Sequence, residues 1–289
     1  MRPTRSLQWL LLFILIAGVL AGSLSAQDRK LRFGVGPLQP TPSETKKAYE
    51  PFFAYLAKKL DRDYDLVATT DWAGISVALA NDQVDVAWMG PWGYVLANND
   101  SGATAIATAK YDGKPIYYAI VVCRPGSGVK AWPQDARGKR VSFADVGSTS
   151  GWLIPTAWFK SRGMNPKELF TYSDGATHAA NEISVASGQV DCATDFDRNR
   201  TAMIESGKLQ QNATEIVWRS DPLPNDAIAV RKGFDPALAR KIQETVVAIS
   251  DGEAKTILPN HYTGFVPATH DSYKMIEDAG ALVGRIKKN

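Results

Sequence analysis

Short apolar runs alternate with segments of helical spacing from residue 31 onward, and no other feature of the sequence restricts the fold as strongly. Ser43 lies at the start of the first helical segment and is expected to cap it. A repeated β–α order predicts a largely parallel sheet with helices on both faces. The expected strand and helix pairs are 31–36 with 43–60, 64–69 with 73–80, and 84–88 with a helix that starts at Trp92.

A long uninterrupted apolar run at 116–123 ends this series, and a second series follows it. The chain would leave the first half through this run and return to it through 220–230. The expected strands of the second part are 140–144, 169–172, 190–194, 215–218 and 226–230, and the expected helices are 150–162, 178–187, 236–251 and 272–283.

Two halves joined at two places predict a two-lobed α/β protein, in which each lobe is a mostly parallel sheet flanked by helices and two crossover strands connect the lobes. The expected lobes are 27–119 plus 226–289 and 120–225. Ligands of open α/β sheets bind at the carboxyl ends of the strands. The crevice between the lobes is therefore the expected ligand site.

The N-terminal residues, 1–26, are expected to be a cleaved secretory signal peptide. Arg2 and Arg5 precede an apolar run at 7–20, and small residues follow that run. An uncleaved membrane anchor is the alternative, although the run is shorter than the about 20 residues that a spanning helix needs. Cleavage would place the mature protein in the periplasm.

The charge balance of the mature chain is close to neutral. The sequence has 33 Lys and Arg against 30 Asp and Glu, and residues 1–26 hold two Arg and no acidic residue, so 33 − 2 = 31 basic residues face 30 acidic ones. A net charge of +1 gives no support for a nucleic-acid partner or for a polybasic membrane surface.

The histidine and cysteine residues do not follow a metal-binding pattern. His178, His261 and His270 are scattered and no CxxC or HExxH spacing occurs, so neither a metal nor another cofactor is expected. Cys123 and Cys192 lie in apolar, strand-like runs and are expected to be two buried thiols. A disulfide is the alternative, because the sequence does not show whether the two sulfur atoms meet.

The segment VGSTSG, between an expected strand and an expected helix, carries the strongest chemical signal. Ser148, Thr149 and Ser150 place hydroxyl donors at the helix start, where free backbone N–H groups and the helix dipole also favour an anion. Gly147 and Gly151 allow the backbone to approach a ligand closely. An ordinary helix cap without a ligand is the alternative. The Walker pattern GxxxxGK[ST] is absent, so the segment gives no support for ATP chemistry.

Four further residues lie where an expected strand meets a loop or a helix, and each could face the same crevice: Trp72, Tyr117, His178 and Asp226. Each also has a purely structural alternative. The two aromatic side chains could pack in the core. The histidine could bond to backbone at its helix start, and the aspartate could cap its own turn.

Several motifs occur in a fixed order along the chain: DWAG at 71–74, VDVAW at 84–88, GPWGY at 90–94, STSG at 148–151, SGWLIP at 150–155, His178 and GQVD at 188–191. These residues resemble the phosphonate-binding proteins of ATP-driven importers, over nearly all of 30–285. The GPWGY and SGWLIP runs resemble the phosphite- and hypophosphite-binding members. The resemblance implies a type II periplasmic-binding fold, a membrane permease as partner and a small phosphorus oxyanion as ligand, without enzymatic turnover.

The resemblance implies seven ligand-binding residues: Trp72, Tyr117, Ser148, Thr149, Ser150, His178 and Asp226. At the position of Arg198, an aminophosphonate-binding member has a glutamate that holds the ammonium group of its ligand. A cationic arginine cannot pair with an ammonium, which favours a smaller ligand without an amine. Asp195 and Asp197 could replace that glutamate, or they could pair with Arg198 or Arg200 outside the cleft.

The chemistry of these residues ranks the possible ligands. Asp226 can accept a hydrogen bond from a P–OH group, and it would repel a fully deprotonated anion such as sulfate. Trp72 and Tyr117 would face a P–H bond or a methyl group, whereas the fourth oxygen of phosphate would lack a partner there, at a cost of roughly 1–3 kcal/mol. Phosphite therefore ranks first, hypophosphite or methylphosphonate next, and phosphate after them.

Two other classes of protein remain as alternatives. An enzyme can use the same two-lobed scaffold, but no activated nucleophile and no GxSxG context is evident. A membrane-tethered sensor or adhesion module would keep the N-terminal segment as an anchor. A monomer is expected, because a clamp of this kind must dock onto a membrane partner.

Overall fold

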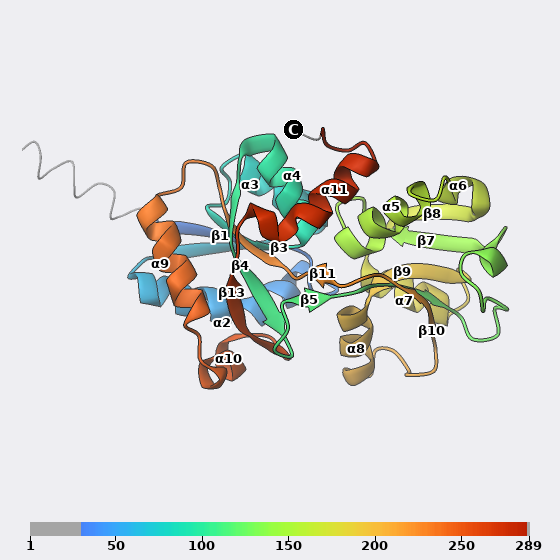
Figure 1. Ribbon diagram of the computed structural model, residues 1–289. Helices are drawn as coiled ribbons and strands as arrows, with labels where there is room; N and C mark the ends of the chain where they lie inside the picture. Colours follow the sequence, from blue (N-terminus) through green and yellow to red (C-terminus); the bar gives the residue numbers. More distant parts are fainter. Residues whose placement is uncertain (1–29, 288–289) are drawn as a thin grey trace, which may run out of the picture.

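The computed structural model describes residues 30–287 as two α/β lobes that lie side by side (Figure 1). The expected signal peptide, 1–26, lies outside the described residues. Among residues 30–287, no helix combines the length and the apolar character that a membrane span requires. The two-lobed α/β architecture (Figure 1) is the one expected from the repeated strand–helix series.

The sheet of the first lobe consists of β1 (Leu31–Val35), β2 (Tyr64–Ala68), β3 (Val86–Met89), β4 (Thr104–Tyr111), β12 (Ala227–Val230) and β13 (Tyr262–Pro267). Its strand order is β13–β4–β12–β3–β1–β2. β1 is parallel to β2 and β3, whereas β12 and β13 run antiparallel to their neighbours. Because β12 lies between β3 and β4, the chain that returns from the second lobe completes the sheet of the first.

The helices of the first lobe are α2 (Pro42–Leu60), α3 (Trp72–Ala80), α4 (Pro91–Ser101), α9 (Pro236–Val247), α10 (Asp251–Ile257) and α11 (Lys274–Leu282), with a 3-10 turn, η3 (His270–Tyr273). Helices α2, α9 and α10 cover one face of the sheet, and α3, α4 and α11 cover the other. The cap of α2 is Thr41, whose Oγ1 accepts a hydrogen bond from Glu44 N at 3.2 Å. The expected cap, Ser43, therefore lies inside the helix.

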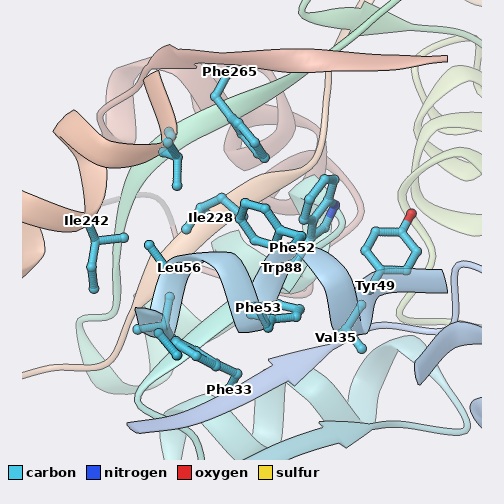
Figure 2. Close-up of a cluster of buried hydrophobic side chains, with 14 of the residues drawn as sticks. Phe33, Val35, Tyr49, Phe52, Phe53, Leu56, Trp88, Ile228, Ile242 and Phe265 are labelled. Carbon is cyan, nitrogen blue, oxygen red and sulfur yellow. The ribbon is translucent and has the colours of Figure 1, made fainter. Parts of the chain in front are cut away.

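The core on one face of this sheet is largely aromatic (Figure 2). Trp88 of β3 packs against Phe52 of α2 and Phe265 of β13, with ring centroids 5.1 and 5.2 Å apart. Met89, the next residue of β3, packs with α3 and α4 on the opposite face. This alternation fixes the carboxyl end of β3, which lies next to the ligand cleft described below.

The sheet of the second lobe consists of β6 (Ala119–Cys123), β7 (Arg140–Ala144), β8 (Thr171–Ala176), β9 (Cys192–Phe196) and β10 (Glu215–Arg219). Its order is β10–β6–β9–β7–β8, with β7 parallel to β8 and β9 and with β6 antiparallel to β9 and β10. The helical elements around it are η1 (Gln134–Ala136), η2 (Thr149–Leu153), α5 (Ile154–Lys160), α6 (Pro166–Leu169), α7 (His178–Ala186) and α8 (Asp197–Glu205).

Both sheets are thus mixed, whereas the sequence predicted mostly parallel sheets. The parallel pairs join strands that are linked through helices within one lobe. The antiparallel pairs involve strands on either side of the crossovers, where the direction of the chain reverses.

Cys123 and Cys192 form a disulfide, so the expectation of two free thiols is wrong. The two residues are directly paired at the ends of β6 and β9, with Cα atoms 4.0 Å apart. Pairing of two strands that lie 69 residues apart in the sequence brings the sulfur atoms together. The local sequence around either cysteine does not predict this pairing.

The two lobes are joined where β5 (Ile116–Tyr117) pairs antiparallel with β11 (Leu223–Pro224). Figure 1 shows this pair of strands between the two lobes. The run expected as one strand at 116–123 is divided at Tyr118, whose backbone N–H donates to Asp197 Oδ1 at 3.1 Å. Tyr117 therefore lies at the crossing point, next to both lobes.

Candidate ligand-binding site

A small cavity between the lobes is lined by all seven residues that the sequence predicted as ligand contacts: Trp72, Tyr117, Ser148, Thr149, Ser150, His178 and Asp226. Leu38, Gly90, Phe196 and Arg198 complete the lining. The cavity volume is about 20 Å³, little more than one ordered water needs. The site can therefore take a ligand of only a few heavy atoms.

Direct contacts between the lobes close this cavity. Thr149 Oγ1 accepts a hydrogen bond from Trp92 N at 2.8 Å, and Trp92 Nε1 donates to Val146 O at 3.3 Å. At the rim of the cleft, Lys208, in the turn after α8, lies 3.3 Å from Glu44 of α2. The structure thus has the lobes in a closed arrangement.

The hydroxyl-bearing turn at 148–150 follows β7 and is rigidly held. Ser148 Oγ accepts a hydrogen bond from Gly151 N at 3.0 Å and caps η2, a π-helical turn that replaces the first turn of the helix expected from residue 150. A Cβ atom on Gly151 would overlap Ala144 Cβ and would lie 2.7 Å from His178 Cε1. Only glycine fits there, so close packing aims the turn at the cavity.

Tyr117 and Trp72 form the aromatic part of the cavity wall. The Trp72 ring lies against Gly36 and Gly90, where an added Cβ would be 2.7 and 3.1 Å from the ring. Burial raises the pKa of the Tyr117 hydroxyl well above its usual value, and interactions with Thr149 and Ser150 act in the opposite direction. The phenol is therefore neutral, and both rings are held in place by close neighbours.

His178 connects the turn to a buried carboxyl group. Its Nε2 atom lies 2.9 Å from Ser148 Oγ, and its Nδ1 atom lies 3.0 Å from Asp195 Oδ1, in a contact that is short but not well aligned for a hydrogen bond. Burial lowers the pKa of His178 to about 4, so the ring is neutral near pH 7. The ring lines the cavity, but both of its nitrogens already face protein groups.

Asp195 and Asp197 do not line the cavity. Asp195 accepts two contacts from Asn199 Nδ2, at 3.0 and 2.9 Å. Asp197 Oδ1 accepts hydrogen bonds from the backbone N–H groups of Tyr118 and Arg198 at the start of α8. Neither carboxylate replaces the glutamate of an aminophosphonate site.

Asp226 immediately precedes β12 and reaches the cavity from the first lobe. Its Oδ2 atom accepts hydrogen bonds from Trp88 Nε1 at 3.3 Å and from Tyr262 OH at 3.1 Å. Within residues 30–287, no side chain or backbone group donates to its Oδ1 atom. Burial raises the pKa of Asp226, and the charge of Arg198 opposes that shift. The carboxyl group thus keeps one oxygen available for a ligand.

Arg198 supplies a cation that the sequence did not predict as a ligand contact. Its NH2 group lies 3.9 Å from Asp226 Oδ2, and its guanidinium group stacks near the rings of Tyr117 and Tyr111, 4.7 and 5.0 Å from their centroids. Its buried Nε–H group has no hydrogen-bond partner among residues 30–287. A buried donor without a partner costs free energy, which a bound anion would recover.

Leu38 and Phe196 were also missed as lining residues. Both are apolar, and an apolar residue carries no chemical signature that separates a cavity wall from a core position. In the described part of the chain, no group of three or more His, Cys, Asp or Glu side chains is arranged to hold a metal ion.

A family model for periplasmic substrate-binding proteins of phosphonate ABC transporters matches residues 33–273. The chain belongs to this family. It is accordingly the periplasmic substrate-binding component of a phosphonate importer, whose partner is a membrane permease. The match is to the family as a whole, and membership of the phosphite- and hypophosphite-binding subgroup stays a prediction.

Two curated relatives extend over most of the chain. The sequence is 26% identical over 268 residues to the phosphate-import protein PhnD of Mycolicibacterium smegmatis, covering 85% of this chain and 83% of that protein. It is 27% identical over 222 residues to the phosphonates-binding periplasmic protein of Escherichia coli, covering 75% of this chain and 65% of that protein. Both relatives are transport proteins rather than enzymes.

Solved structures share the fold. A binding protein of a phosphonate ABC transporter from Pseudomonas aeruginosa matches with a TM-score of 0.79 at 21% identity, covering 87% of this chain and 85% of that one. PhnD1 from Prochlorococcus marinus, solved in complex with methylphosphonate, matches with a TM-score of 0.79 at 18% identity, covering 89% and 98%. The expected type II periplasmic-binding fold is confirmed.

Proposed function

We propose that this protein captures phosphite in the cavity between its lobes and delivers it to the permease of its importer. One observation carries the proposal: the hydroxyl-bearing turn of the second lobe and Asp226 of the first lobe line the same cavity of about 20 Å³. Donors for a charged oxygen and an acceptor for a protonated oxygen are thus available to one small ligand.

The charge of the anion is met mainly by fixed donors. Thr149 and Ser150 offer hydroxyl groups, and the backbone N–H groups at the start of η2 favour an anion. Arg198 and Asp226 together are neutral, but the free Nε–H group of Arg198 adds one charged donor. A monoanion is therefore matched better than a dianion.

Asp226 would select for a ligand that keeps a proton. Its Oδ1 atom can accept a hydrogen bond from P–OH, which phosphite provides near neutral pH. Sulfate provides no such proton and would meet the carboxylate with like charge. The complex therefore requires one proton between the ligand and Asp226.

The aromatic wall would select against phosphate. Trp72 cannot withdraw, because Gly36 and Gly90 lie directly against its ring. A P–H bond needs no hydrogen-bond partner at this wall, whereas a fourth oxygen would be buried without one. That cost, roughly 1–3 kcal/mol, corresponds to about 5- to 150-fold in affinity.

Methylphosphonate is the second candidate, because a structural relative from Prochlorococcus marinus is known in complex with that compound. Its methyl group would replace the P–H bond at the aromatic wall. Hypophosphite ranks with it, and phosphate follows. The small cavity and the position of Arg198 both disfavour longer or amine-bearing phosphonates.

Isothermal titration calorimetry tests the ranking directly. The panel is phosphite, hypophosphite, methylphosphonate, phosphate, sulfate and 2-aminoethylphosphonate, all at one pH and one ionic strength. We expect phosphite to bind tightest and sulfate to bind weakly or not at all. Tightest binding of 2-aminoethylphosphonate would overturn the argument from Arg198, and tightest binding of phosphate would overturn the argument from the aromatic wall.

Export, domain boundaries and oligomeric state belong to the same proposal. The signal peptide 1–26 would be removed, lobe 1 would comprise 27–119 plus 226–289, lobe 2 would comprise 120–225, and the mature protein would be a monomer. N-terminal sequencing of the exported protein and light scattering test the first and last points. Ligand binding would close the lobes about β5 and β11, which small-angle scattering with and without phosphite would detect.

One observation favours a hydrolase as a candidate from another class. Ser148, His178 and Asp195 stand in the order of a nucleophile, a base and an orienting carboxylate. The pKa of His178, lowered to about 4 by burial, makes it a weak base, and Ser148 is occupied as a helix cap. Phosphorus NMR of phosphite and methylphosphonate after long incubation with the protein decides: unchanged ligand excludes turnover.

A further inference from the structure

We propose that Asp195 controls, through His178, whether Ser148 donates a hydrogen bond to the bound oxyanion, so that capture of the anion is coupled to uptake of a proton by a buried cluster of the second lobe. The inference rests on the proposed function, since it requires an oxyanion at the 148–150 turn. Asp195 would be a positioning residue, because it does not touch the cavity.

The hydroxyl proton of Ser148 is the first element of the argument. Ser148 Oγ already accepts a hydrogen bond from Gly151 N, and it lies 2.9 Å from His178 Nε2. When Nε2 carries no proton, the Ser148 hydroxyl donates to it and offers only lone pairs to the cavity. When Nε2 carries a proton, the ring donates to Ser148, and the hydroxyl is free to donate to an anion.

The carboxyl group of Asp195 decides which of these states exists. Asp195 Oδ1 lies 3.0 Å from His178 Nδ1. If neither atom carried a proton, their lone pairs would repel each other, so one of the two atoms must be protonated. With Asp195 ionised and the ring neutral, the ring proton sits on Nδ1 and Nε2 is bare. To protonate Nε2, the pair must hold a second proton, either on Asp195 or as an imidazolium. The donating state of Ser148 therefore contains one proton more than the other state.

The environment of Asp195 makes a proton the available counter-charge. Asp195 is fully buried, and among residues 30–287 its ion-pair contact is with His178 and not with any Lys or Arg side chain. Arg200, the nearby candidate, donates instead to Thr214 and to Gln211 O. A buried carboxylate without a cation is costly, so neutralisation by a proton is favoured when a second negative charge arrives with the ligand.

The charged and titratable groups that face the His178–Asp195 pair are Glu182 of α7, Asp197 and Arg200 of α8, and Asp145 after β7. Burial raises the pKa of Asp195 to about 7, and interactions with Glu182 and Asn199 oppose the shift. Burial and the neighbouring Asp195 raise the pKa of Glu182 to about 9. Glu182 is thus neutral near pH 7, while Asp195 changes its protonation around pH 7.

The expected effect follows from these values. At pH 8 a group with a pKa of about 7 is ionised in about nine molecules of ten, so full conversion on binding takes up about 0.9 proton. The fraction of molecules in which Asp195 is protonated, and in which Ser148 can donate to the anion, falls from about one half at pH 7 to about one hundredth at pH 9. The affinity therefore falls by up to about 50-fold. The loss is smaller, about tenfold, when the non-donating state still binds with one hydrogen bond fewer.

The test compares the wild type with Asp195→Asn by calorimetry at pH 8 in two buffers of different ionisation enthalpy, with phosphite and methylphosphonate as probes. The asparagine Nδ2 group can donate to His178 Nδ1, which keeps the ring proton on Nε2 and leaves Ser148 free to donate. We expect the variant to take up about 0.9 proton less than the wild type and to lose less affinity than the wild type between pH 7 and pH 9. Asp197→Asn removes a neighbouring charge outside the cavity but leaves the Asp195 carboxyl group in place, so this control should still take up a proton on binding.

Protons that belong to the ligand or to other titrating groups are common to both proteins and cancel in the difference. Equal proton numbers for wild type and Asp195→Asn, or an equal loss of affinity from pH 7 to pH 9, would refute the inference. Should Asp195→Asn not fold, proton uptake is measured instead for hypophosphite binding to a protein whose only substitution is His261→Gln. This substitution removes a titratable histidine that contacts Glu205 at the rim of the cleft. Hypophosphite stays a monoanion without a P–OH proton in this range, so any proton taken up on its binding goes to protein groups, Asp226 and Asp195 among them, and binding without proton uptake would refute the inference. Absence of binding by all three probes would instead refute the proposed function.

Discussion

Replacing Asp226 with asparagine tests the selectivity of the site without changing the shape of the side chain. Trp88 Nε1 and Tyr262 OH both donate to Oδ2, so the amide oxygen of asparagine should take that place. The amide NH2 group would then occupy the position of Oδ1 at the cavity. A ligand P–OH group would meet a donor there instead of an acceptor.

The magnitude follows from the type of hydrogen bond that is lost. A hydrogen bond to a charged partner contributes about 1.5–3 kcal/mol and a neutral one about 0.5–1.5 kcal/mol. Loss of this charged acceptor should therefore weaken phosphite binding by about 1.5–3 kcal/mol, or about 10- to 150-fold. Sulfate should gain affinity, because the like charge is gone and Arg198 loses its partner at 3.9 Å.

Calorimetry with phosphite and sulfate on Asp226→Asn measures both effects under one set of conditions. The ratio of the sulfate Kd to the phosphite Kd should fall at least tenfold. Asp197→Asn is the matched control, since it removes a carboxylate that lies outside the cavity. Thermal unfolding of both variants checks that the fold is retained. An unchanged ratio in a folded Asp226→Asn protein would remove Asp226 from the selection mechanism.

Three further predictions concern the cavity boundary, the disulfide and the closed arrangement. Arg198→Ala should join the cavity to a neighbouring groove of about 480 Å³ and admit ethylphosphonate in calorimetry, whereas the bulkier Arg198→Met should not. Reduction of the Cys123–Cys192 disulfide, which spans 69 residues, should lower the free energy of unfolding in urea by about 4 kcal/mol; no change would contradict that estimate. A hydrogen bond with Glu205 raises the pKa of His261 above 6.5, although burial opposes the shift. Protonated His261 should thus hold the ligand-free lobes together below about pH 6.5, and this contact should weaken as the pH rises through the raised pKa. Small-angle scattering at pH 6 and pH 9 should therefore show more open lobes at the higher pH. His261→Gln should abolish this pH dependence.

The sequence predicted the strands and helices with strong apolar periodicity. The strand at 140–144 is confirmed at both ends as β7, and the helix expected from His178 begins there as α7. β4, β13 and α8 were missed, and the helix expected at 236–251 ends at Val247 as α9, while a separate helix, α10, begins at Asp251. β4 has the sequence TAIATAKY, in which small residues and threonine give little apolar contrast. α8 is a largely polar helix, so its spacing carries no core-facing stripe.

The cavity was predictable to the extent that its chemistry is local. Ser148, Thr149 and Ser150 sit in one short segment whose donors are visible in the sequence, and parallel strands bring their neighbours to the same edge. The orientation of Arg198 was not predictable, because it depends on packing against Tyr111 and Tyr117 from other elements. The connection from Ser148 through His178 to Asp195 has the same cause, since it joins η2, α7 and β9.

A crystal structure of the protein grown with phosphite tests the central claim most directly. The account predicts a phosphorus atom inside the small cavity, with its charged oxygens on the 148–150 turn and its protonated oxygen within hydrogen-bonding distance of Asp226 Oδ1. Phosphite bound in the larger groove beside Arg198, or bound in the cavity with Asp226 turned away from it, would contradict the account.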